Sequence, residues 1–177
     1  MNNTVIEYSA GLYMLAEESG KEGAILSEIR TLSPLFTDEY MRLLTNPDIP
    51  KTERVSLVSE LLDGRVDEYL SNFVKLMTER GIATELRRCF TEYERLYYEA
   101  SGIVRVTAES TVPLTDAQKE KLSSKLSAHI GHPVEMTYKI NKTLIGGIRL
   151  SYNNRLIDDT VAAKIKQLGE RLSGVVV

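Results

Sequence analysis

Acidic pairs are among the few residues of this 177-residue chain whose type and spacing could support chemistry. Glu17-Glu18 and Asp158-Asp159 are two such pairs, and each consists of direct sequence neighbours. Neighbouring residues on a helix do not face each other, so neither pair suits an acid–base dyad. Asp158 and Asp159 precede a predicted helix, where a carboxylate accepts hydrogen bonds from free backbone N–H groups. The sequence therefore predicts capping residues here and no catalytic residue.

Cysteine and histidine are too scarce to indicate a metal site. The single cysteine, Cys89, excludes an internal disulfide and a cysteine cluster. The two histidines, His129 and His132, flank the end of a predicted helix with no cysteine or carboxylate at ligand spacing. Cys89 fits a small packing residue of a helix, with a reactive thiol beside two arginines as the alternative. We expect no metal ion and no cofactor.

Two further patterns resemble ligand sites but have simpler interpretations. Gly146-Gly147 precedes a predicted strand, so it lacks the helix N-terminus that binds phosphate. We expect a sharp bend or a close backbone contact there. Tyr93, Tyr97 and Tyr98 could stack on nucleic-acid bases, but the glutamates around them would repel phosphate. Packing is therefore the better interpretation of these tyrosines.

The first hundred residues have the periodicity of amphipathic helices. Apolar residues recur at steps of three and four, as in Val5, Tyr8, Leu12 and Leu15. Capping and breaking residues divide the pattern into short elements. The predicted helices cover residues 5–15, 24–32, 37–44, 50–62, 66–77 and 84–99. Because the loops between them are short, neighbours should be antiparallel, which predicts a six-helix bundle over residues 1–101.

The periodicity changes at Ser101-Gly102, where strand-forming residues begin to alternate with polar ones. Thr115 and Gln118 form a capping-box pattern at the start of one helix. Another helix should follow Asp158 or Asp159, with its apolar stripe on Val161, Ile165, Leu168 and Leu172. The predicted strands cover residues 103–111, 134–140, 148–152 and 155–157, and the first helix covers 115–130. We interpret residues 102–177 as a β-α-β-β unit plus a C-terminal helix, which makes the chain mainly α with a small α+β domain.

Charge differs between the two halves. Residues 1–101 hold 11 basic and 18 acidic side chains, a net of −7, whereas residues 102–177 hold 11 and 7, a net of +4. This asymmetry suggests two modules with different partners. The basic half leaves an RNA- or ribosome-associated protein as an alternative, provided that its cations line one face. Those cations are Lys119, Lys121, Lys125, Lys139, Lys142 and Arg149.

Apolar surface is in excess on two of the predicted helices. The first helix is apolar on more than one side, and Leu76 widens the stripe of the fifth. Such an excess indicates either central burial or a groove for a partner helix. Composition alone does not decide between them. No stretch approaches the ~18 consecutive apolar residues of a membrane span, and no secretory signal precedes the first helix.

Several segments resemble the delta subunit of F-type ATP synthases, which is related to the mitochondrial oligomycin sensitivity-conferring protein. Residues 144–161, LIGGIRLSYNNRLIDDTV, are similar to a glycine-pair strand, a turn and a capped last helix of that family. Residues 8–16, 70–82 and 103–118 resemble its first helix, its fifth helix and the entry to its second domain. The chain departs from the family at the Asn153-Asn154 turn, at Asn141 and at Asp159-Thr160. Each departure keeps the ability to turn or to cap.

The resemblance implies a non-catalytic subunit of the peripheral stalk, which resists rotor torque by joining the catalytic head to the membrane-anchored b subunits. The N-terminal domain would bind the N-terminal helix of an alpha subunit, in a groove between the first and fifth helices. The candidate groove residues are Tyr8, Leu12, Leu15, Phe73, Leu76 and Met77. The C-terminal domain would bind the C-terminal ends of the b subunits, with Gly146, Gly147 and Asp158 as its structural motif. The implied location is the cytoplasmic face of a bacterial cell membrane, with no nucleic acid bound.

Overall fold

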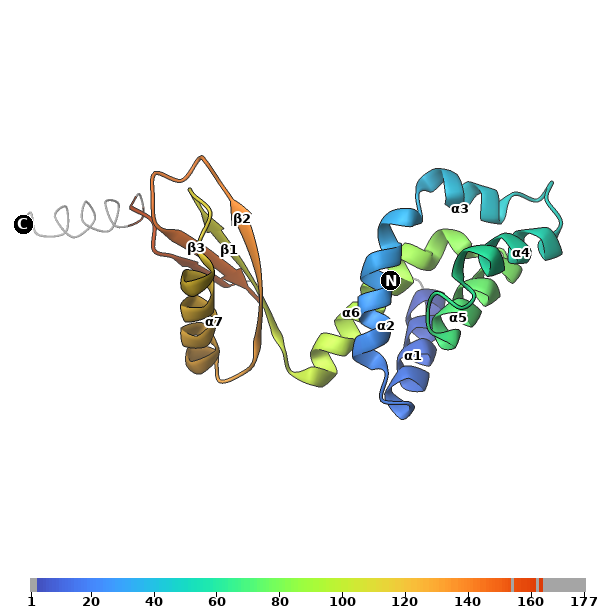
Figure 1. The fold of residues 1–177 in the computed structure, drawn as a ribbon, viewed down its shortest axis with the longest axis horizontal. Helices are drawn as coiled ribbons and strands as arrows, with labels where there is room; N and C mark the ends of the chain where they lie inside the picture. Colours follow the sequence, from blue (N-terminus) through green and yellow to red (C-terminus); the bar gives the residue numbers. More distant parts are fainter. Residues whose placement is uncertain (1–2, 154, 162, 164–177) are drawn as a thin grey trace, which may run out of the picture. The chain divides into compact units, whose positions relative to one another are not determined.

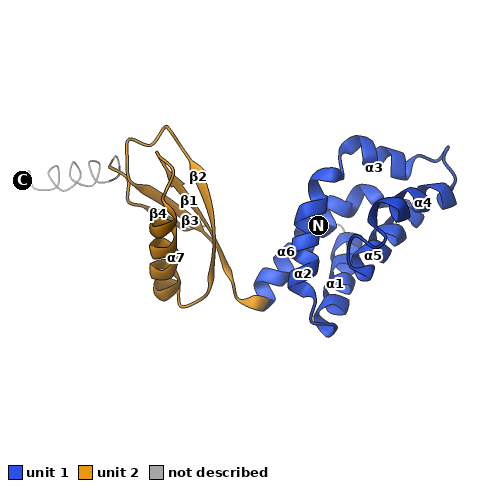
Figure 2. Cartoon of the chain, in the orientation of Figure 1, with its two compact units in different colours: residues 1–100 blue, residues 101–177 orange. Residues whose placement is uncertain are grey.

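The computed structural model of the chain describes residues 3–153, 155–161 and 163. The chain divides into two compact units, Met1–Ala100 and Ser101–Val177, which have different colours in Figure 2. The described part is mainly helical and contains a small four-stranded mixed sheet. At this level the predicted fold class is confirmed.

The first unit consists of short helices joined by tight turns (Figure 1). Its elements are α1 (Asn3–Glu18), α2 (Glu22–Leu32), the 3₁₀ turn η1 (Ser33–Leu35), α3 (Asp38–Thr45), α4 (Lys51–Leu62), α5 (Glu68–Glu79), the 3₁₀ turn η2 (Ala83–Glu85) and α6 (Leu86–Ser101). Side chains define several starts: the Thr37 hydroxyl accepts the Tyr40 N–H, and the Asp67 carboxylate accepts the Tyr69 N–H. The predicted helices are therefore present, with boundaries that these caps adjust.

Two boundaries differ from the sequence prediction. Val66 was expected inside the fifth helix, but α5 begins at Glu68 because Asp67 is its N-cap. Val66 instead packs against the core from the preceding turn. Pro50 was expected in the first turn of the fourth helix, and it occupies the N-cap position of α4. In both cases the helical face is as predicted and only the first residue moves.

The core of the first unit takes residues from every helix. Its largest fully buried side chains include Phe36, Ile25, Leu44, Leu62, Leu70, Met77, Leu86 and Tyr93. Cys89 is 1% exposed and burial raises the pKa of its thiol, so the prediction of a packing residue is confirmed. Tyr93 is also buried, and its hydroxyl donates to the Glu22 carbonyl oxygen at 3.0 Å. The packing interpretation of this tyrosine is therefore confirmed as well.

Arg54 is an unexpected cation within this unit. The residue is only 6% exposed, and its Nη1 donates to the Leu44 carbonyl oxygen at 3.0 Å. Leu44 lies in the last turn of α3, where carbonyl groups lack helical partners and the helix dipole favours a positive charge. Arg54 therefore ties α4 to the end of α3.

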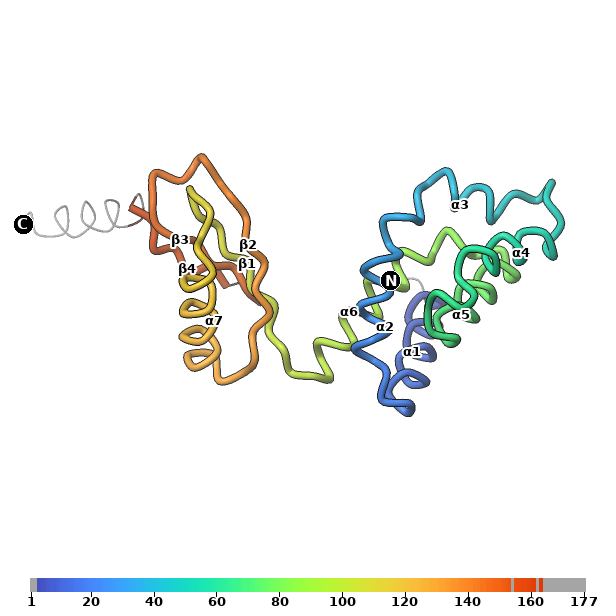
Figure 3. Tube along the Cα trace, in the orientation of Figure 1, coloured from blue at the N-terminus to red at the C-terminus, as the bar shows by residue number. Residues whose placement is uncertain are grey.

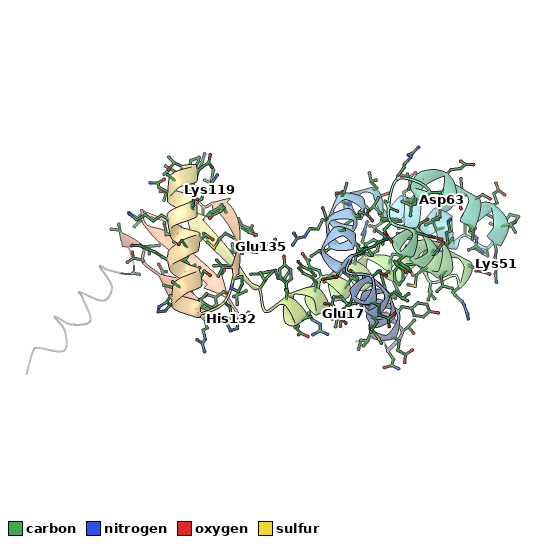
Figure 4. The ribbon with its side chains drawn as sticks, turned by 60° about the horizontal axis from the view of Figure 1, so that its bottom comes forward. Glu17, Lys51, Asp63, Lys119, His132 and Glu135 are labelled. Atoms are coloured by element: carbon green, nitrogen blue, oxygen red, sulfur yellow. The ribbon has the colours of Figure 1, made fainter. Side chains whose placement is uncertain are left out.

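The second unit is a sheet covered on one face by a helix (Figure 4). Its elements are β1 (Val104–Ser110), α7 (Asp116–Ile130), β2 (Val134–Ile140), β3 (Ile148–Tyr152) and β4 (Arg155–Asp158). The trace in Figure 3 runs from β1 through α7 to β2. The strand order is β2-β1-β3-β4, with β1 and β2 parallel and the other pairs antiparallel. The four predicted strands are thus present, and the short β4, predicted over 155–157, pairs with β3 at the edge of the sheet.

The alternation predicted for the strands matches the two faces of the sheet. Val106, Ala108 and Leu150 are buried, and they pack with Leu126 of α7. The predicted capping box is confirmed, since the Thr115 hydroxyl and the Gln118 amide each accept the other residue's backbone N–H. Strand alternation and the capping box therefore both predict the second unit correctly.

Gly146-Gly147 lies where two backbone segments come very close. A Cβ atom on Gly147 would stand 2.4 Å from the Asp159 carbonyl oxygen and 2.7 Å from the Thr160 Cα atom. Backbone hydrogen bonds join the segments, since Asp159 N donates to Ile148 and Val161 N donates to Gly146. The prediction of a close backbone contact is confirmed.

Asp158 holds the turn that follows β4. Its carboxylate accepts the Thr160 N–H and the Arg149 guanidinium, each at 3.1 Å. Hydrogen bonds from Thr160, then those from Arg149, hold the carboxyl pKa below its usual range. The Thr160 hydroxyl accepts the Ala163 N–H at 3.2 Å, so the cap falls on Thr160 instead of on Asp158 or Asp159. The rest of the predicted C-terminal helix, including Ile165, Leu168 and Leu172, lies outside the described residues.

Gly147→Ala should destabilise the second unit more than a glycine change at an open position. Gly147 has a φ of 89°, where an alanine is strained by about 1–2 kcal/mol. The alanine Cβ would also clash with the backbone of Asp159 and Thr160, so we expect the free energy of unfolding to fall by more than about 2 kcal/mol. Gly131→Ala is the control, because Gly131 has a φ of 77° with nothing within 4 Å of its Cβ position. Hydrogen exchange of the β1 and β3 amides would measure both losses. Equal losses would contradict the close contact.

Candidate functional site

An apolar groove of about 640 Å³ lies between α1 and α5 of the first unit. It is lined by Glu7, Tyr8, Gly11, Leu12, Met14, Leu15 and Glu18 of α1, and by Tyr69, Asn72, Phe73 and Leu76 of α5. Most of these side chains are aliphatic or aromatic. A groove of this kind suits the apolar face of an amphipathic helix.

The two helices that form the groove are tied together at one end. Lys21, just after α1, lies 2.8 Å from Asp67, just before α5, measured from Nζ to Oδ2. Nearby, the Ser19 hydroxyl donates to the Tyr69 hydroxyl at 3.2 Å. Because the end of α1 meets the start of α5, the helices are antiparallel. These polar contacts position the end of the groove that Glu18 and Tyr69 line.

The residues predicted for the groove separate into floor and rim. Leu12 and Phe73 form the floor, with exposed fractions of 4% and 7%. Leu15 and Leu76 form the rim, with exposed fractions of 47% and 39%, and Tyr8 is half-buried beside them. The structure therefore brings these residues together along one hollow.

Met77 is placed differently from the other five predicted residues. It is fully buried in the core of the first unit and does not line the groove. It follows Leu76 directly, and consecutive helical residues point about 100° apart. Met77 therefore lies on the face of α5 that packs into the core.

Sequence reasoning missed six of the lining residues. They are Glu7, Gly11, Met14, Glu18, Tyr69 and Asn72. Their spacing is informative in hindsight, because Gly11 and Asn72 stand four residues before Leu15 and Leu76. No atom beyond its own helix and neighbours lies within 4 Å of the position that a Gly11 Cβ would take. The groove is therefore open above this glycine.

Other hollows are less suited to an apolar partner. One beside α3 has a larger volume, about 820 Å³, but polar side chains such as Thr37, Glu39 and Arg42 interrupt its lining. One in the second unit, about 570 Å³, is lined by Arg105, Arg155 and four other residues. Of these three hollows, the α1–α5 groove has the most continuous apolar lining.

The described residues do not support the other binding chemistries. They contain no group of three side chains fit to hold a metal ion, and none of their helices is long and apolar enough for a membrane span. The basic stripe needed for RNA does not form. Lys119 lies on α7 with its Nζ 2.8 Å from Asp116, whereas Lys139 and Arg149 alternate with strand residues that pack toward α7. The basic side chains are thus divided between the helix and the opposite face of the sheet.

The sequence matches one family of known proteins over most of its length. The sequence profile described as "ATP synthase delta (OSCP) subunit" matches residues 6–172. The ATP synthase subunit delta of Prochlorococcus marinus (strain AS9601) is 31% identical over an alignment of 179 positions, which covers 98% of each chain. That of Clostridium kluyveri (strain ATCC 8527) is 25% identical over 163 residues, which cover 91% of this chain and 90% of the relative.

Solved structures show a related fold. A chain of the Toxoplasma gondii mitochondrial ATP synthase hexamer matches with a TM-score of 0.68 at 13% identity, covering 95% of this chain and 96% of its own length. A chain of Polytomella F-ATP synthase in rotary substate 3A matches with a TM-score of 0.51 at 21% identity, covering 56% and 90%. At these identities the likeness concerns the fold alone.

The sequence relationships define a non-catalytic accessory subunit of an ATP synthase. The chain belongs to the ATP synthase delta (OSCP) subunit family, the peripheral-stalk subunits of F-type ATP synthases. The alternative of an RNA- or ribosome-associated protein is not supported.

Asp67→Ala should lower the free energy of unfolding at neutral pH and change it little in acid. Asp67 caps α5, and a lost N-cap costs about 1 kcal/mol. The hydrogen bond from Lys21 holds the pKa of Asp67 below its usual range. Its contribution is therefore complete above the unfolded carboxyl pKa of about 4, and is lost as the pH falls through the lower folded pKa.

Urea unfolding at neutral pH and near pH 3 would measure this difference in stability between Asp67→Ala and the parent chain. Asp48→Ala is the control, since Asp48 is exposed and its carboxylate has no partner among the described residues. A stability gap for Asp67→Ala that stays constant down to about pH 2 would contradict the assigned role.

Proposed function

We propose that this chain joins the catalytic head of the synthase to the b subunits through its two halves. Residues 1–101, acting as a six-helix domain, would bind the head, and residues 102–177 would bind the C-terminal ends of the b subunits. The family membership supports this division of labour, as does the change of charge from −7 to +4 between the halves. The two relatives described above are bacterial, which favours the cytoplasmic face of a bacterial cell membrane.

The occupant of the α1–α5 groove is the N-terminal helix of an alpha subunit. The observation that carries this assignment is the pair of exposed leucines, Leu15 and Leu76, on either side of a buried apolar floor. Leucine side chains left in water are stabilised by burial, by roughly 1.5–3 kcal/mol each when fully covered. An amphipathic helix would cover both at once.

The second unit also leaves apolar side chains exposed. Ile145, Leu156 and Ile140 have exposed fractions of 75%, 61% and 56%. Apolar surface of this kind supports the assignment of a protein partner to residues 102–177, for which we propose the b subunits.

The mechanical task fits binding without chemistry. A stator must resist torque without being consumed, so it needs affinity and slow release from both neighbours. Once one module has bound its part of the assembly, the other module is held at high effective concentration near its own site. Two contacts of modest affinity therefore give tight binding together. The chain then transmits force through helices and strands, and no reactive group takes part.

Aspartate at either rim position should strongly weaken binding while leaving the fold intact. Leu15→Asp or Leu76→Asp places a charge in the apolar groove and should weaken binding of an alpha-subunit N-terminal peptide by roughly 10- to 100-fold. Fluorescence anisotropy with the labelled peptide and the full chain would measure the affinity, and circular dichroism would report the fold. Leu12 and Phe73 are unsuitable targets, because their burial means that aspartate would disrupt the core.

Leu35→Asp is the matched control. Leu35 is 53% exposed on η1 and does not line the groove. It should bind the peptide like the parent chain. Loss of binding in Leu35→Asp, together with normal binding in Leu15→Asp, would place the partner elsewhere.

A further inference from the structure

We propose that the two ends of the α1–α5 groove select a basic partner helix, with Glu7 and Glu18 each receiving one lysine or arginine of the partner. This inference rests on the proposed function, since it concerns the same groove. It adds a rule of recognition to the apolar contact: the partner is an amphipathic helix with a cation near each end of its apolar stripe.

The spacing of the two glutamates matches a helical ligand. Both belong to α1, both are exposed, and both line the groove. They are eleven residues apart (18 − 7), which is about three helical turns or about 16 Å. Eleven residues return to nearly the same face of a helix, so Leu15 and the open position at Gly11 lie on the surface between them.

The groove has charge of one sign. Glu7 and Glu18 are the charged residues that line it within the described part of the chain, and α5 contributes Tyr69, Asn72 and Leu76 beside them. Residues 1–101 have 11 basic and 18 acidic side chains, a net of −7, so the surrounding field has the same sign. An apolar helix with cations at both ends complements this surface, whereas one with acidic ends is repelled.

Neither glutamate is neutralised within the described part of the chain. Glu7 accepts a hydrogen bond from the uncharged Asn3 side-chain amide, and Glu18 has no ion-pair partner there. Other acids of the same unit are paired, such as Asp63 with Lys75 and Glu92 with Arg95. The two carboxylates at the groove thus have no cation of the described chain beside them.

The position of Glu18 is not explained by the stability of α1. Glu18 is the last residue of α1, and the last turn contains no basic residue. A carboxylate at this end opposes the helix dipole and is slightly unfavourable for the helix. Removing the charge should therefore leave the fold as stable as before or slightly more stable, which separates a binding role from a structural one.

The test uses the full chain and two synthetic amphipathic helices of about 15 residues. The peptides share one apolar stripe and differ only in two end residues about three turns apart, lysine in one and glutamate in the other. The parent chain should bind the lysine peptide at least about fivefold more tightly at low salt, because each of two rim ion pairs contributes modestly. Raised salt should reduce the preference, since these charges are exposed to solvent.

Glu7→Gln/Glu18→Gln should remove the preference without loss of thermal stability. Glu17→Gln/Glu60→Gln is the matched control: it removes two exposed glutamates outside the groove, Glu17 on α1 (Figure 4) and Glu60 on α4, and should keep the preference. Equal binding of both peptides by the parent chain would overturn the proposal. So would a preference that persists in Glu7→Gln/Glu18→Gln or disappears in the control.

An alpha-subunit N-terminal peptide, measured in parallel, distinguishes this proposal from the proposed function. If that peptide binds the parent chain and Leu15→Asp abolishes its binding while the lysine preference is absent, the function stands and the charge rule is wrong. If the lysine preference is present and the alpha-subunit peptide does not bind, the charge rule stands and the assigned occupant is wrong.

Discussion

The antiparallel packing of α1 against α5 is the contact on which the binding surface depends. Leu12 and Phe73 are buried where the two helices meet, while Leu15 and Leu76 remain exposed above them. The same helices are joined at one end by Lys21 and Asp67. Because the floor belongs to a closed core, the groove exists before any partner arrives. A preformed groove loses little conformational entropy on binding, which favours the slow release that a stator needs.

The second unit relies on a different constraint, the close approach of two backbone segments. Gly147 admits the carbonyl oxygen of Asp159 to a place that a side chain would fill, and Asp158 holds the following turn through the Thr160 N–H and Arg149. This arrangement pins β3 to the segment after β4, beside a buried cluster that, within the described residues, consists of Val106, Ala108, Leu126 and Leu150. The glycine pair therefore serves structure, and the family resemblance of this segment reflects geometry instead of ligand chemistry.

Periodicity and caps predicted the helices and strands because those signals are local. Thr115 and Gln118 form the capping box that the sequence indicates. Exposure is not local: Leu12 and Leu15 are three residues apart on one stripe, yet one is floor and the other rim, because α5 covers only part of α1. Leu76 and Met77 are direct neighbours with opposite environments, because consecutive residues of a helix point about 100° apart. The burial of Arg54 could not be predicted from the sequence either, because its partner, the Leu44 carbonyl oxygen, belongs to the end of another helix.

The most direct test of the account is where the partner helix lands on the protein. Amide NMR of the isotope-labelled full chain, titrated with an alpha-subunit N-terminal peptide, reports each backbone site separately. The account predicts that the largest shift changes fall on the groove residues of α1 and α5, including Gly11, Leu15, Asn72 and Leu76. Changes centred on the hollow beside α3, around Leu35 and Leu43, with none at the groove, would contradict it.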